Sequence, residues 1–515
     1  MTAYLLLALL FAACEGGVVP EPVTPDPNPE PEPVKERALV VPEGLTLTEQ
    51  VEAIVLAWKD CSTLEEGYVV DRSLAGQSGT AQFLLPADSQ TWTDEAPPAG
   101  TLTYTVRSYW HMERSEPATV SISRLGQPVF ETASLQVSAH MAALGLRLMD
   151  DGGAEVRMGV EYGGKMQEFP AKVAVGSTAY LLLEDLEPGL DYSVRPWARN
   201  AAGTVYGQAA SVRLSQAPAP LTLDWEDAGI GGLPDGLSIL RSSTDVPGHH
   251  VNLWCAVADM TAGTMELRTT KASTATEPGE YIRGTLASDN VCVLVNGGYF
   301  SSPSTSYSYV CDRGTKLASN VSVLSRKDSY NVTRGFFGID RDGRTAVAWI
   351  QGDSPYAAPL PVYDGGPSLS IGQNLPVIEG WTPWSAIGGG PVLLRDGRMC
   401  FDFLKSDAGT YLSNHELFQT DIFADGLRAP RTAIGTDGKG KIVLLVADGR
   451  GSGGSTGLTL DELALIMAGL GCTDVLNLDG GGSSAFLTGN EGTLHNSPSD
   501  GKERKVLTYV WLSAR

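Results

Sequence analysis

The sequence predicts a multidomain protein in which two all-β sandwich modules precede an α+β domain. The chain has 515 residues, more than one ordinary domain holds, and 42% of them are apolar, which is enough for several cores. Residues 37–216 alternate apolar and polar positions in short runs between turn residues, a pattern typical of strands. Residues 217–515 are rich in glycine and contain a helix with clear start and stop signals. These differences in sequence pattern predict one module at 37–126, a second at 127–216 and the last domain at 217–515.

The N-terminus is typical of an exported protein. Tyr4 to Ala13 are apolar and too few to span a bilayer, and small residues precede Cys14. We interpret residues 1–14 as a signal peptide with a lipobox, so that lipid on Cys14 anchors the chain at the cell envelope, in the outer membrane of a Gram-negative bacterium. An ordinary secretory signal is the alternative, because Phe11 replaces the usual leucine and no basic residue precedes the apolar run. Residues 15–36 are rich in proline and glutamate and predict an extended stalk.

Charge and cysteine usage argue against two classes of function. Lys and Arg number 37 against 60 Asp and Glu, a net charge of −23, whereas nucleic-acid binding needs a basic surface. The cysteines after Cys14 are dispersed, with no C-x-x-C and no neighbouring histidine pair, which argues against a zinc site. Their spacing does not say whether they form disulfides. We expect no nucleic-acid partner and no required cofactor, although a divalent cation between carboxylates and a phosphate is compatible with the sequence.

Each module contains several strand-like runs, such as LTYTVRSYW in the first and DYSVRPWARN in the second. The run from Leu186 to Tyr192 resembles the L-x-P-x-x-x-Y tyrosine corner of fibronectin type III modules. That resemblance implies modules that act as spacers or binding platforms. It also places three aromatic residues in the core of the first module: Trp58, Tyr68 and Tyr104. Three others would suit a sugar platform or ordinary packing, and we favour packing: Trp110, Trp197 and Tyr206.

The last domain contains one well-marked helix followed by a strand. Thr459 and Glu462 form a capping box, S/T-x-x-E, and Gly471 is a natural stop. A strand from Asp474 to Leu478 comes next and ends directly before Asp479 and three glycines. Apolar residues at i, i+3, i+4 and i+7 predict one buried helix face: Leu460, Leu463, Ala464 and Met467.

The stretch NLDGGGSSAF, which begins at Asn477, is the first candidate for chemistry. Its three glycines leave the backbone uncrowded, so that N–H groups can converge on an anion beside the Asp479 carboxylate. A tight turn capped by Asp479 explains the same residues equally well. The spacing does not fit G-x-G-x-x-G, so a dinucleotide site has no support. G-x-S-x-G occurs at Ser455, but seven residues separate this serine from the strand KIVLLVA, which disfavours a nucleophile elbow.

Seven short motifs occur between about residue 290 and residue 515. They are NGGYF from Asn296, GGGPVL from Gly388, RAPRTAIG from Arg428, DGR from Asp448, STGL from Ser455, NLDGGGSS from Asn477, and NSPSD from Asn496 with Arg504. In this order they resemble the phosphodiester glycosidase family. The family cleaves sugar-1-phosphate diesters at the glycosidic C1–O bond. The resemblance therefore implies an exported hydrolase whose substrate is a phosphorylated glycan or sugar phosphodiester.

The resemblance also implies roles for individual residues. A carboxylate would act at the anomeric centre, where positive charge develops, while arginine and backbone N–H groups hold the phosphate. Asp479 is the first candidate for the carboxylate and Asp448 the second, and Arg431 is the first candidate for the phosphate clamp. The other candidates would bind substrate or position the carboxylates: Asn296, Arg450, Ser455, Asn477, Gly480, Gly481, Gly482 and Arg504. Structural alternatives remain, since Arg431 could pair with a buried aspartate and Asn296 could stabilise a turn.

Two other functions fit the same sequence. A surface glycan-binding lipoprotein would use the pocket or the sandwiches without turnover, and an ordinary glycoside hydrolase would need no phosphate. Aspartate and arginine side chains converging on the glycine loop would favour an enzyme, whereas a row of exposed aromatic residues on a sandwich would favour binding. His415 matches none of the motifs and is interpreted as a loop residue, and His495 either lines the pocket or packs beside it.

Overall fold

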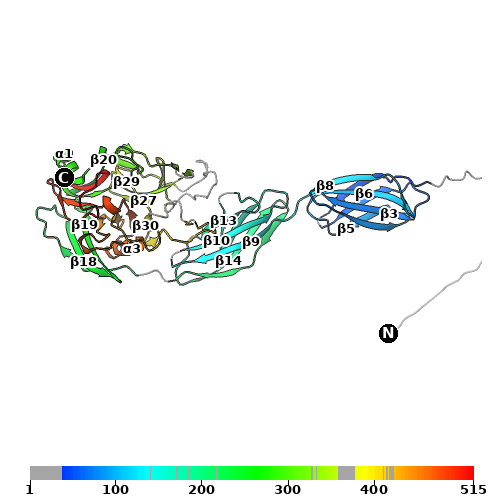
Figure 1. Ribbon diagram of the computed structural model, residues 1–515, viewed down its shortest axis with the longest axis horizontal. Helices are drawn as coiled ribbons and strands as arrows, with labels where there is room; N and C mark the ends of the chain where they lie inside the picture. The colour runs from blue at the N-terminus through cyan, green and yellow to red at the C-terminus, as the bar shows by residue number, and fades with distance from the viewer. Residues whose placement is uncertain are drawn as a thin grey trace, which may run out of the picture. The chain divides into compact units, whose positions relative to one another are not determined.

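The computed structural model describes residues 38–515 apart from 51, 140, 170–171, 184, 216–218, 326–328, 332, 358–376, 410, 413–415 and 417–422. The predicted lipobox with Cys14, the stalk over 15–36 and His415 lie outside the described residues. The chain separates into two compact units, Met1–Arg124 and Leu125–Arg515, and Figure 1 draws the first of them mostly in blue. Among the described residues, no helix is both long and apolar enough to cross a membrane.

The first unit is a β-sandwich, as its alternating sequence predicts. One sheet has the strand order β1-β2-β5 and the other β4-β3-β6-β7, with β8 also paired to β6. Trp58, Tyr68 and Tyr104 are buried in the core between the sheets, as expected. The strands are β1 (Glu43–Glu49), β2 (Ile54–Lys59), β3 (Gly67–Leu74), β4 (Thr80–Pro86), β5 (Thr91–Asp94), β6 (Gly100–Trp110), β7 (Glu113–Arg114) and β8 (Ala118–Arg124).

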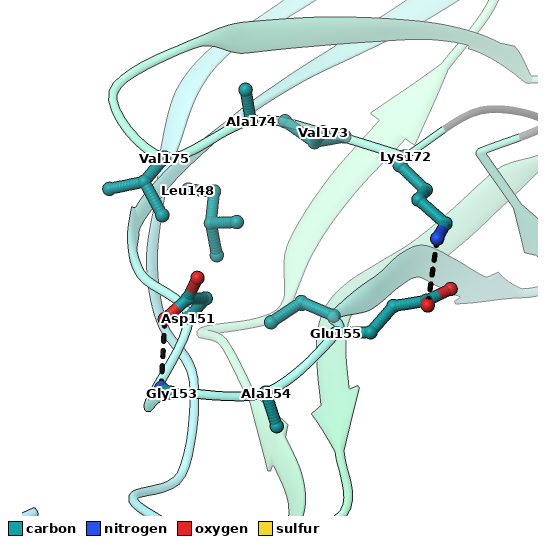
Figure 2. A pocket seen from close by; sticks show the side chains of 10 residues that line it. Leu148, Asp151, Gly153, Ala154, Glu155, Lys172, Val173, Ala174 and Val175 are labelled. Carbon is teal, nitrogen blue, oxygen red and sulfur yellow. Dashed lines mark hydrogen bonds and ion pairs between the residues drawn. The ribbon is translucent and has the colours of Figure 1, made fainter. Parts of the chain in front are cut away.

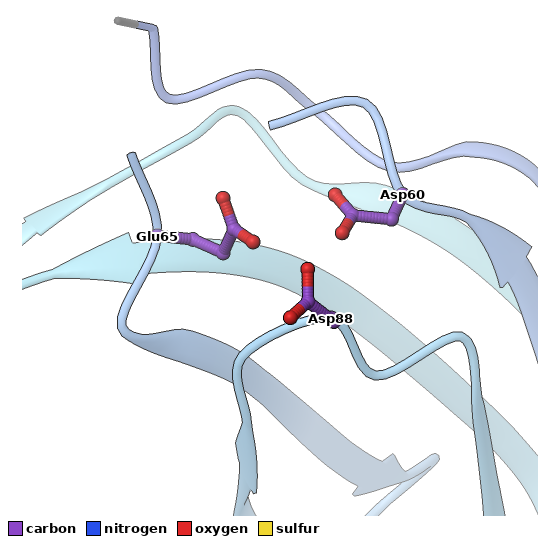
Figure 3. Close-up of side chains that lie close together, drawn as sticks. All are labelled: Asp60, Glu65 and Asp88. Atoms are coloured by element: carbon purple, nitrogen blue, oxygen red, sulfur yellow. The ribbon is translucent and has the colours of Figure 1, made fainter. Parts of the chain in front are cut away.

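Three carboxylates gather in the first unit: Asp60 after β2, Glu65 before β3, and Asp88 between β4 and β5 (Figure 3). One oxygen of each lies within 4.8 Å of the others, and no other group of three His, Cys, Asp or Glu with this spacing occurs among the described residues. Tyr68 donates its hydroxyl to Asp60. The cluster belongs to a different unit from the glycine loop and takes no part in the site described below.

The second unit begins with another β-sandwich. Its sheets have the orders β13-β10-β9 and β12-β11-β14-β15, with β16 paired to β14. The Tyr192 hydroxyl accepts a hydrogen bond from the Glu187 N–H at 3.0 Å, which is the local geometry of the predicted tyrosine corner. The strands are β9 (Val129–Val137), β10 (Ala142–Asp150), β11 (Arg157–Tyr162), β12 (Lys165–Glu168), β13 (Thr178–Leu183), β14 (Asp191–Asn200), β15 (Gly203–Tyr206) and β16 (Ala210–Arg213).

This sandwich has a hollow of about 410 Å³ that begins at the end of β10. Figure 2 shows its two polar contacts: an ion pair of 2.7 Å between Lys172 and Glu155, and the Asp151 carboxylate accepting from the Gly153 N–H. The rest of its lining is small or aliphatic, for example Leu148. No group of side chains suited to catalysis lines it.

Three antiparallel sheets build the rest of the second unit. Their strand orders are β17-β18-β19-β33-β32-β34-β30-β31, β20-β37-β21-β35-β36 and β23-β22-β29-β26-β27-β28, and β24 pairs only with β25. The strands are β17 (Glu226–Asp227), β18 (Leu237–Val246), β19 (His249–Asp259), β20 (Met265–Thr276), β21 (Val291–Asn296), β22 (Val310–Asp312), β23 (Thr315–Ala318), β24 (Val323–Ser325), β25 (Ser329–Asn331), β26 (Arg334–Ile339), β27 (Thr345–Gln351), β28 (Ser354–Tyr356), β29 (Ser385–Gly388), β30 (Val392–Arg395), β31 (Arg398–Met399), β32 (Arg431–Thr436), β33 (Lys441–Ala447), β34 (Asp474–Asn477), β35 (Phe486–Thr488), β36 (Thr493–Leu494) and β37 (Val506–Ala514).

This domain is largely β, which corrects the predicted α+β class. About 50% of the chain is strand and 6% is helix. The predicted helix is present as α3 (Leu460–Gly469), with both hydrogen bonds of its capping box, and a shorter α-helix is α1 (Pro278–Gly284). Short 3-10 turns are formed by η1 (Met260–Ala262), η2 (Ser452–Gly454) and η3 (Gly481–Ser483). One helix with clear local signals does not make the domain α+β, and the short apolar runs around it are strands, which such runs alone do not distinguish from helices.

Both faces of the largest sheet are buried, which explains its continuous apolar runs. In β33, Leu444 and Val446 face a core shared with the other two sheets, whereas Val443 and Leu445 face the core that α3 covers. Successive side chains of a strand point to opposite faces, so a strand covered on both sides needs apolar residues at every position. The predicted apolar face of α3 is buried in the second of these cores: Leu460, Leu463, Ala464 and Met467.

Candidate active site

The glycine loop lies at an edge of the largest sheet, where several strand ends meet. Arg431 opens β32 and is paired with the last residue of β33, and Asn477, the last residue of β34, pairs two positions further along β32. Asp448 directly follows β33, and Asp479 follows β34 by two residues. The antiparallel register therefore brings both carboxylates and Arg431 to the same edge.

Asn296 joins this edge to the second sheet. It is the last residue of β21 and is fully buried. Its Nδ2 donates to the backbone oxygen of Asp479 at 2.6 Å, and its Oδ1 accepts from the Thr432 hydroxyl at 2.8 Å and from the Ala485 N–H at 3.2 Å. The structure thus places Asn296 where it holds the Asp479 loop rather than where it faces a substrate.

Tyr299 makes a second connection between motifs. Its hydroxyl donates to the backbone oxygen of Gly390 at 2.6 Å and accepts from Nδ2 of Asn477 at 3.0 Å. Asn477 Nδ2 also donates to Gly390 at 2.9 Å, while its buried Oδ1 has no hydrogen-bond partner among the described residues. NGGYF, GGGPVL and NLDGGGSS therefore form one network.

The remaining motifs join the same network. The Gly481 N–H donates to the backbone oxygen of Pro430 at 2.8 Å. The Ser455 hydroxyl donates to the backbone oxygen of Asp448 at 2.7 Å, and Asn496 donates to the Asp448 carboxylate at 3.0 Å. Motifs that are spread over some 200 residues of sequence thus meet in one place.

Asp479 is a half-buried carboxylate at the start of the glycine loop. Its Oδ1 accepts from the Gly480 N–H at 2.9 Å. Burial raises the pKa of Asp479 from 3.8 to about 6, and the Ser483 hydroxyl, the Arg504 charge and the Gly480 N–H oppose that rise. At neutral pH the group is ionised but only weakly stabilised, which suits a base or nucleophile.

Asp448 is the more deeply buried of the two carboxylates. Its Oδ1 accepts from Asn496 and from the Ser497 N–H at 2.9 Å, and no hydrogen bond from the described residues reaches its Oδ2. Burial raises the pKa of Asp448 to about 6, and those two donors oppose the rise. Ser455 is fully buried and donates to the Asp448 backbone, so it supports the loop and is not placed as a nucleophile.

Asp448→Asn should stabilise the second unit at pH 8 by about 1–3 kcal/mol and change little at pH 4. The folded-state pKa of about 6 lies above the ordinary 3.8, so folding favours the protonated carboxyl. That contribution is present below about pH 4 and is lost as the pH rises through 6. The asparagine introduced at position 448 cannot ionise, so the penalty on the charged form disappears. Its side-chain oxygen can still accept the hydrogen bond from Asn496. Denaturant unfolding at both pH values measures the difference.

Asp224→Asn is the control for this experiment, because Asp224 is exposed, belongs to the same unit and has no hydrogen-bond or ion-pair partner among the described residues, so its substitution removes no buried charge. A destabilisation by Asp448→Asn that is the same at pH 8 and pH 4 would contradict the expected penalty on the charged form.

Two of the three glycines admit arginine side chains to the loop. If Gly482 were replaced by alanine, the new Cβ would lie 2.1 Å from Nη2 of Arg504. An alanine in place of Gly481 would have its Cβ 3.2 Å from Nη2 of Arg450. Arg504 also pairs with Asp500 at 2.7 Å, whereas the Arg450 side chain makes no hydrogen bond or ion pair with any described residue. Both guanidinium groups therefore rest directly on the glycine backbone.

The N–H groups of two of these glycines are already engaged. Gly480 donates to the Asp479 carboxylate and Gly481 to Pro430. The expected convergence of N–H groups on an anion is therefore not formed by this pair. The positive charge at the loop comes from arginine side chains, to which the glycines give access.

Arg431 is buried beneath the site. Its Nε donates to the Leu458 backbone oxygen at 3.0 Å and its Nη2 to that of Leu427 at 2.9 Å. It forms no ion pair with a described carboxylate, so pairing with Asp448 or Asp479 is not observed. Burial lowers the pKa of Arg431 to about 10; Tyr299 acts against this and the charge of Arg450 adds to it.

Two buried charged residues near the site were not found from the sequence. Arg334 begins β26, and its guanidinium lies 4.9 Å from the centre of the Tyr299 ring. Glu416 accepts from the Gly335 N–H and from Trp349 Nε1, each at 2.9 Å, and burial raises its pKa to about 7. A lone arginine before the apolar run GFFGI was the only signal, and a weak one.

His495 packs beside the NSPSD motif. Its ring lies 5.0 Å from that of Trp254, and its Nε2 is 2.6 Å from the Thr488 hydroxyl. Burial lowers the pKa of His495, so the ring is neutral at physiological pH. The sequence leaves open whether His495 lines the pocket or packs beside it, and the structure shows that it packs beside it.

Comparison with known proteins identifies the domain that holds this site. Residues 289–512 match the model of the phosphodiester glycosidase family. N-acetylglucosamine-1-phosphodiester alpha-N-acetylglucosaminidase is 28% identical in Bos taurus and 29% identical in Homo sapiens, over 210 residues in each case. These matches cover 40% of this chain and 33% of either relative, so the chain spans about a third of the length of the curated relatives.

Solved structures resemble both parts of the chain. The zebrafish N-acetylglucosamine-1-phosphodiester alpha-N-acetylglucosaminidase catalytic domain, auto-inhibited by its pro-peptide, is 21% identical with a TM-score of 0.38, over 57% of this chain and 89% of that one. A two-domain fibronectin type III segment of chicken tenascin is 16% identical with a TM-score of 0.22, over 33% of this chain and 98% of that one. The N-terminal region resembles fibronectin type III domains, and the C-terminal half carries a domain of the phosphodiester glycosidase family.

Proposed function

We propose that the C-terminal domain hydrolyses the glycosidic bond of a sugar-1-phosphodiester. In this reaction the oxygen of water bonds to C1 of the sugar, and the C1–O bond to the phosphate breaks. The electron pair of that bond leaves on the phosphate oxygen, and a carboxylate takes up the proton of water. The products are a free sugar and a phosphate monoester.

One observation carries this function: the Asp479 carboxylate lies beside arginine side chains, on a loop made largely of glycine. The Asp479 carboxylate supplies negative charge where the sugar becomes positive in the transition state. Arg450 and Arg504 supply positive charge where the phosphate departs. Because a phosphate monoester is a better leaving group than a sugar alcohol, these arginines can replace a strong general acid.

Asp448 is assigned as the second catalytic carboxylate. Asn496 and Ser497 fix one of its oxygens, which leaves Oδ2 for a proton. With a pKa near 6, it can accept a proton at neutral pH and release it again to water. Arg431 and Asn477 are assigned to the floor of the site, where they hold the strand ends and the loop.

The full-length chain should release sugar from an N-acetylglucosamine-1-phosphodiester at least about a hundredfold faster than from the methyl glycoside of the same sugar. The reason is that arginines placed for a phosphate give no benefit to a neutral leaving group. Product sugar is measured with and without chelator, which also tests for a divalent cation. Equal rates on both substrates would point to an ordinary glycoside hydrolase, and release from neither would exclude the proposed activity.

A glycan-binding role for the sandwiches has less support. Tyr206 is the only large aromatic residue found exposed among the described residues, at 43%, and the Arg195 guanidinium lies 4.1 Å over its ring. Trp197 is buried, and Trp110 is stacked on His111. A single exposed ring does not form the row of aromatic residues that a sugar platform needs.

Export and anchoring complete the proposed function. The apolar run before Cys14 and the proline-rich stretch after it support a chain tethered to the cell envelope by lipid on Cys14. Cys14→Ser should then release the protein from the membrane fraction. Recovery of the variant in that fraction, at the wild-type level, would show that lipid on Cys14 is not the anchor, and a wild-type protein absent from that fraction would favour an ordinary secretory signal.

A further inference from the structure

We propose that the second β-sandwich positions one wall of the candidate active site. The contact runs through residues 401–407, here named the docking segment, which belongs to the C-terminal part of the second unit. The sandwich would then be more than a spacer, because it would hold the segment that packs in the same apolar cluster as Tyr299. The effect on turnover rests on the proposed function, whereas the effect on the structure of the site does not.

One side of the docking segment is held by side chains of the sandwich. Gln136 of β9 donates to the Lys405 backbone oxygen at 2.7 Å and accepts from the Lys405 N–H at 3.3 Å. A single amide side chain thus satisfies both backbone groups of one residue, as a neighbouring strand would. The Tyr180 hydroxyl of β13 accepts from the Asp407 N–H at 2.8 Å. A further contact joins Ser138 and Asp402.

The other side of the docking segment packs into the core beside the site. Phe401 is buried and meets Phe403 edge-on, with 5.9 Å between ring centres, and Phe403 meets Tyr411 at 5.4 Å. Phe423 belongs to the same apolar cluster and lies edge-on to Tyr299 at 6.2 Å. Aromatic rings in a close-packed core cannot shift independently, so a shift of the docking segment also displaces the Tyr299 ring.

Tyr299 passes this constraint to the candidate catalytic groups. Its hydroxyl links Gly390 to Asn477, which stands two residues before Asp479. If the segment loosened, these hydrogen bonds would lengthen or break, although no group touching the substrate would have been changed. Gln136 and Tyr180 are therefore positioning residues.

The double variant Gln136→Ala/Tyr180→Phe of the full-length chain tests this inference. Hydrogen exchange followed by mass spectrometry should rise about tenfold over residues 401–407 and should also rise over 297–300 and 388–392. kcat/KM for an N-acetylglucosamine-1-phosphodiester should fall about three- to tenfold, with the pH dependence unchanged. Glu131→Ala is the matched control, because it lies on the same strand and removes only an exposed ion pair with Arg147.

Each result decides the matter. Wild-type exchange over 401–407 in the double variant would show that Gln136 and Tyr180 do not hold the segment, and they would not be positioning residues. Faster exchange confined to 401–407, with unchanged kinetics, would show that the segment does not act on the site. If the wild-type chain releases no sugar, the proposed function fails, while exchange over 297–300 still tests the inference by itself.

Discussion

Asp479→Asn should lower kcat for a sugar-1-phosphodiester by at least about a thousandfold while leaving the fold intact. The change removes the negative charge that faces the developing positive charge at the anomeric carbon, and it keeps the shape of the side chain. It also keeps an oxygen for the Gly480 N–H, which now bonds to Oδ1 at 2.9 Å. Because burial disfavours the charged form, the loss of that charge should not destabilise the protein. Steady-state kinetics and thermal unfolding measure the two effects.

The pH dependence gives this experiment a second readout. Wild-type kcat/KM should rise with pH through an apparent pKa near 6 and then level off. The reason is that only the deprotonated carboxylate is active, and this form predominates above that pH. Asp448 has a similar pKa, so the two groups would titrate as a pair. Asp474→Asn is the control: this aspartate begins the same strand, and its carboxylate is bound to Thr473 and to the Asp396 N–H. Comparable turnover by Asp479→Asn and Asp474→Asn would remove Asp479 from the mechanism.

Local signals in the sequence were sufficient for several elements. The α3 helix has both its capping box and its apolar face within ten residues, so its ends could be predicted without knowledge of the fold. Asp479 could be placed at a strand end for the same reason. The tyrosine corner needs only residues 186–192, and its hydrogen bond spans five positions.

Contacts between distant residues could not be predicted in this way. Glu416 accepts from Gly335, which is 81 residues away, and nothing near Glu416 in the sequence indicates that its carboxylate turns inward. The sequence predicts Asn296 as a site residue, but it gives no sign that the Asn296 amide holds the Asp479 backbone, 183 residues further on. The glycine loop shows the same limit, because a run of glycines does not reveal which side chains will lie against it. Here those side chains are arginines.

Arg450→Ala should lower kcat/KM for a sugar-1-phosphodiester about a hundredfold and leave stability almost unchanged. The Arg450 side chain is exposed and pairs with no described residue, so its removal leaves no buried group unsatisfied. Its guanidinium rests on Gly481, and its charge is felt by buried Arg431. Two like charges held close together repel each other in the free protein. A phosphate bound by Arg450 would offset that repulsion.

The leaving group provides the sharpest test of this role. If Arg450 stabilises the departing phosphate, Arg450→Ala should affect substrates with poor phosphate leaving groups more than those with good ones. Arg450→Lys should recover only part of the activity, because lysine keeps the charge but not the planar fork that binds two oxygens at once. Arg241→Ala is the matched control, since this arginine is exposed and pairs only with Glu226 at 3.1 Å. An Arg450→Ala protein whose kcat/KM equals that of Arg241→Ala on every substrate would mean that the phosphate binds elsewhere, and Arg504 would then be the remaining arginine on the loop.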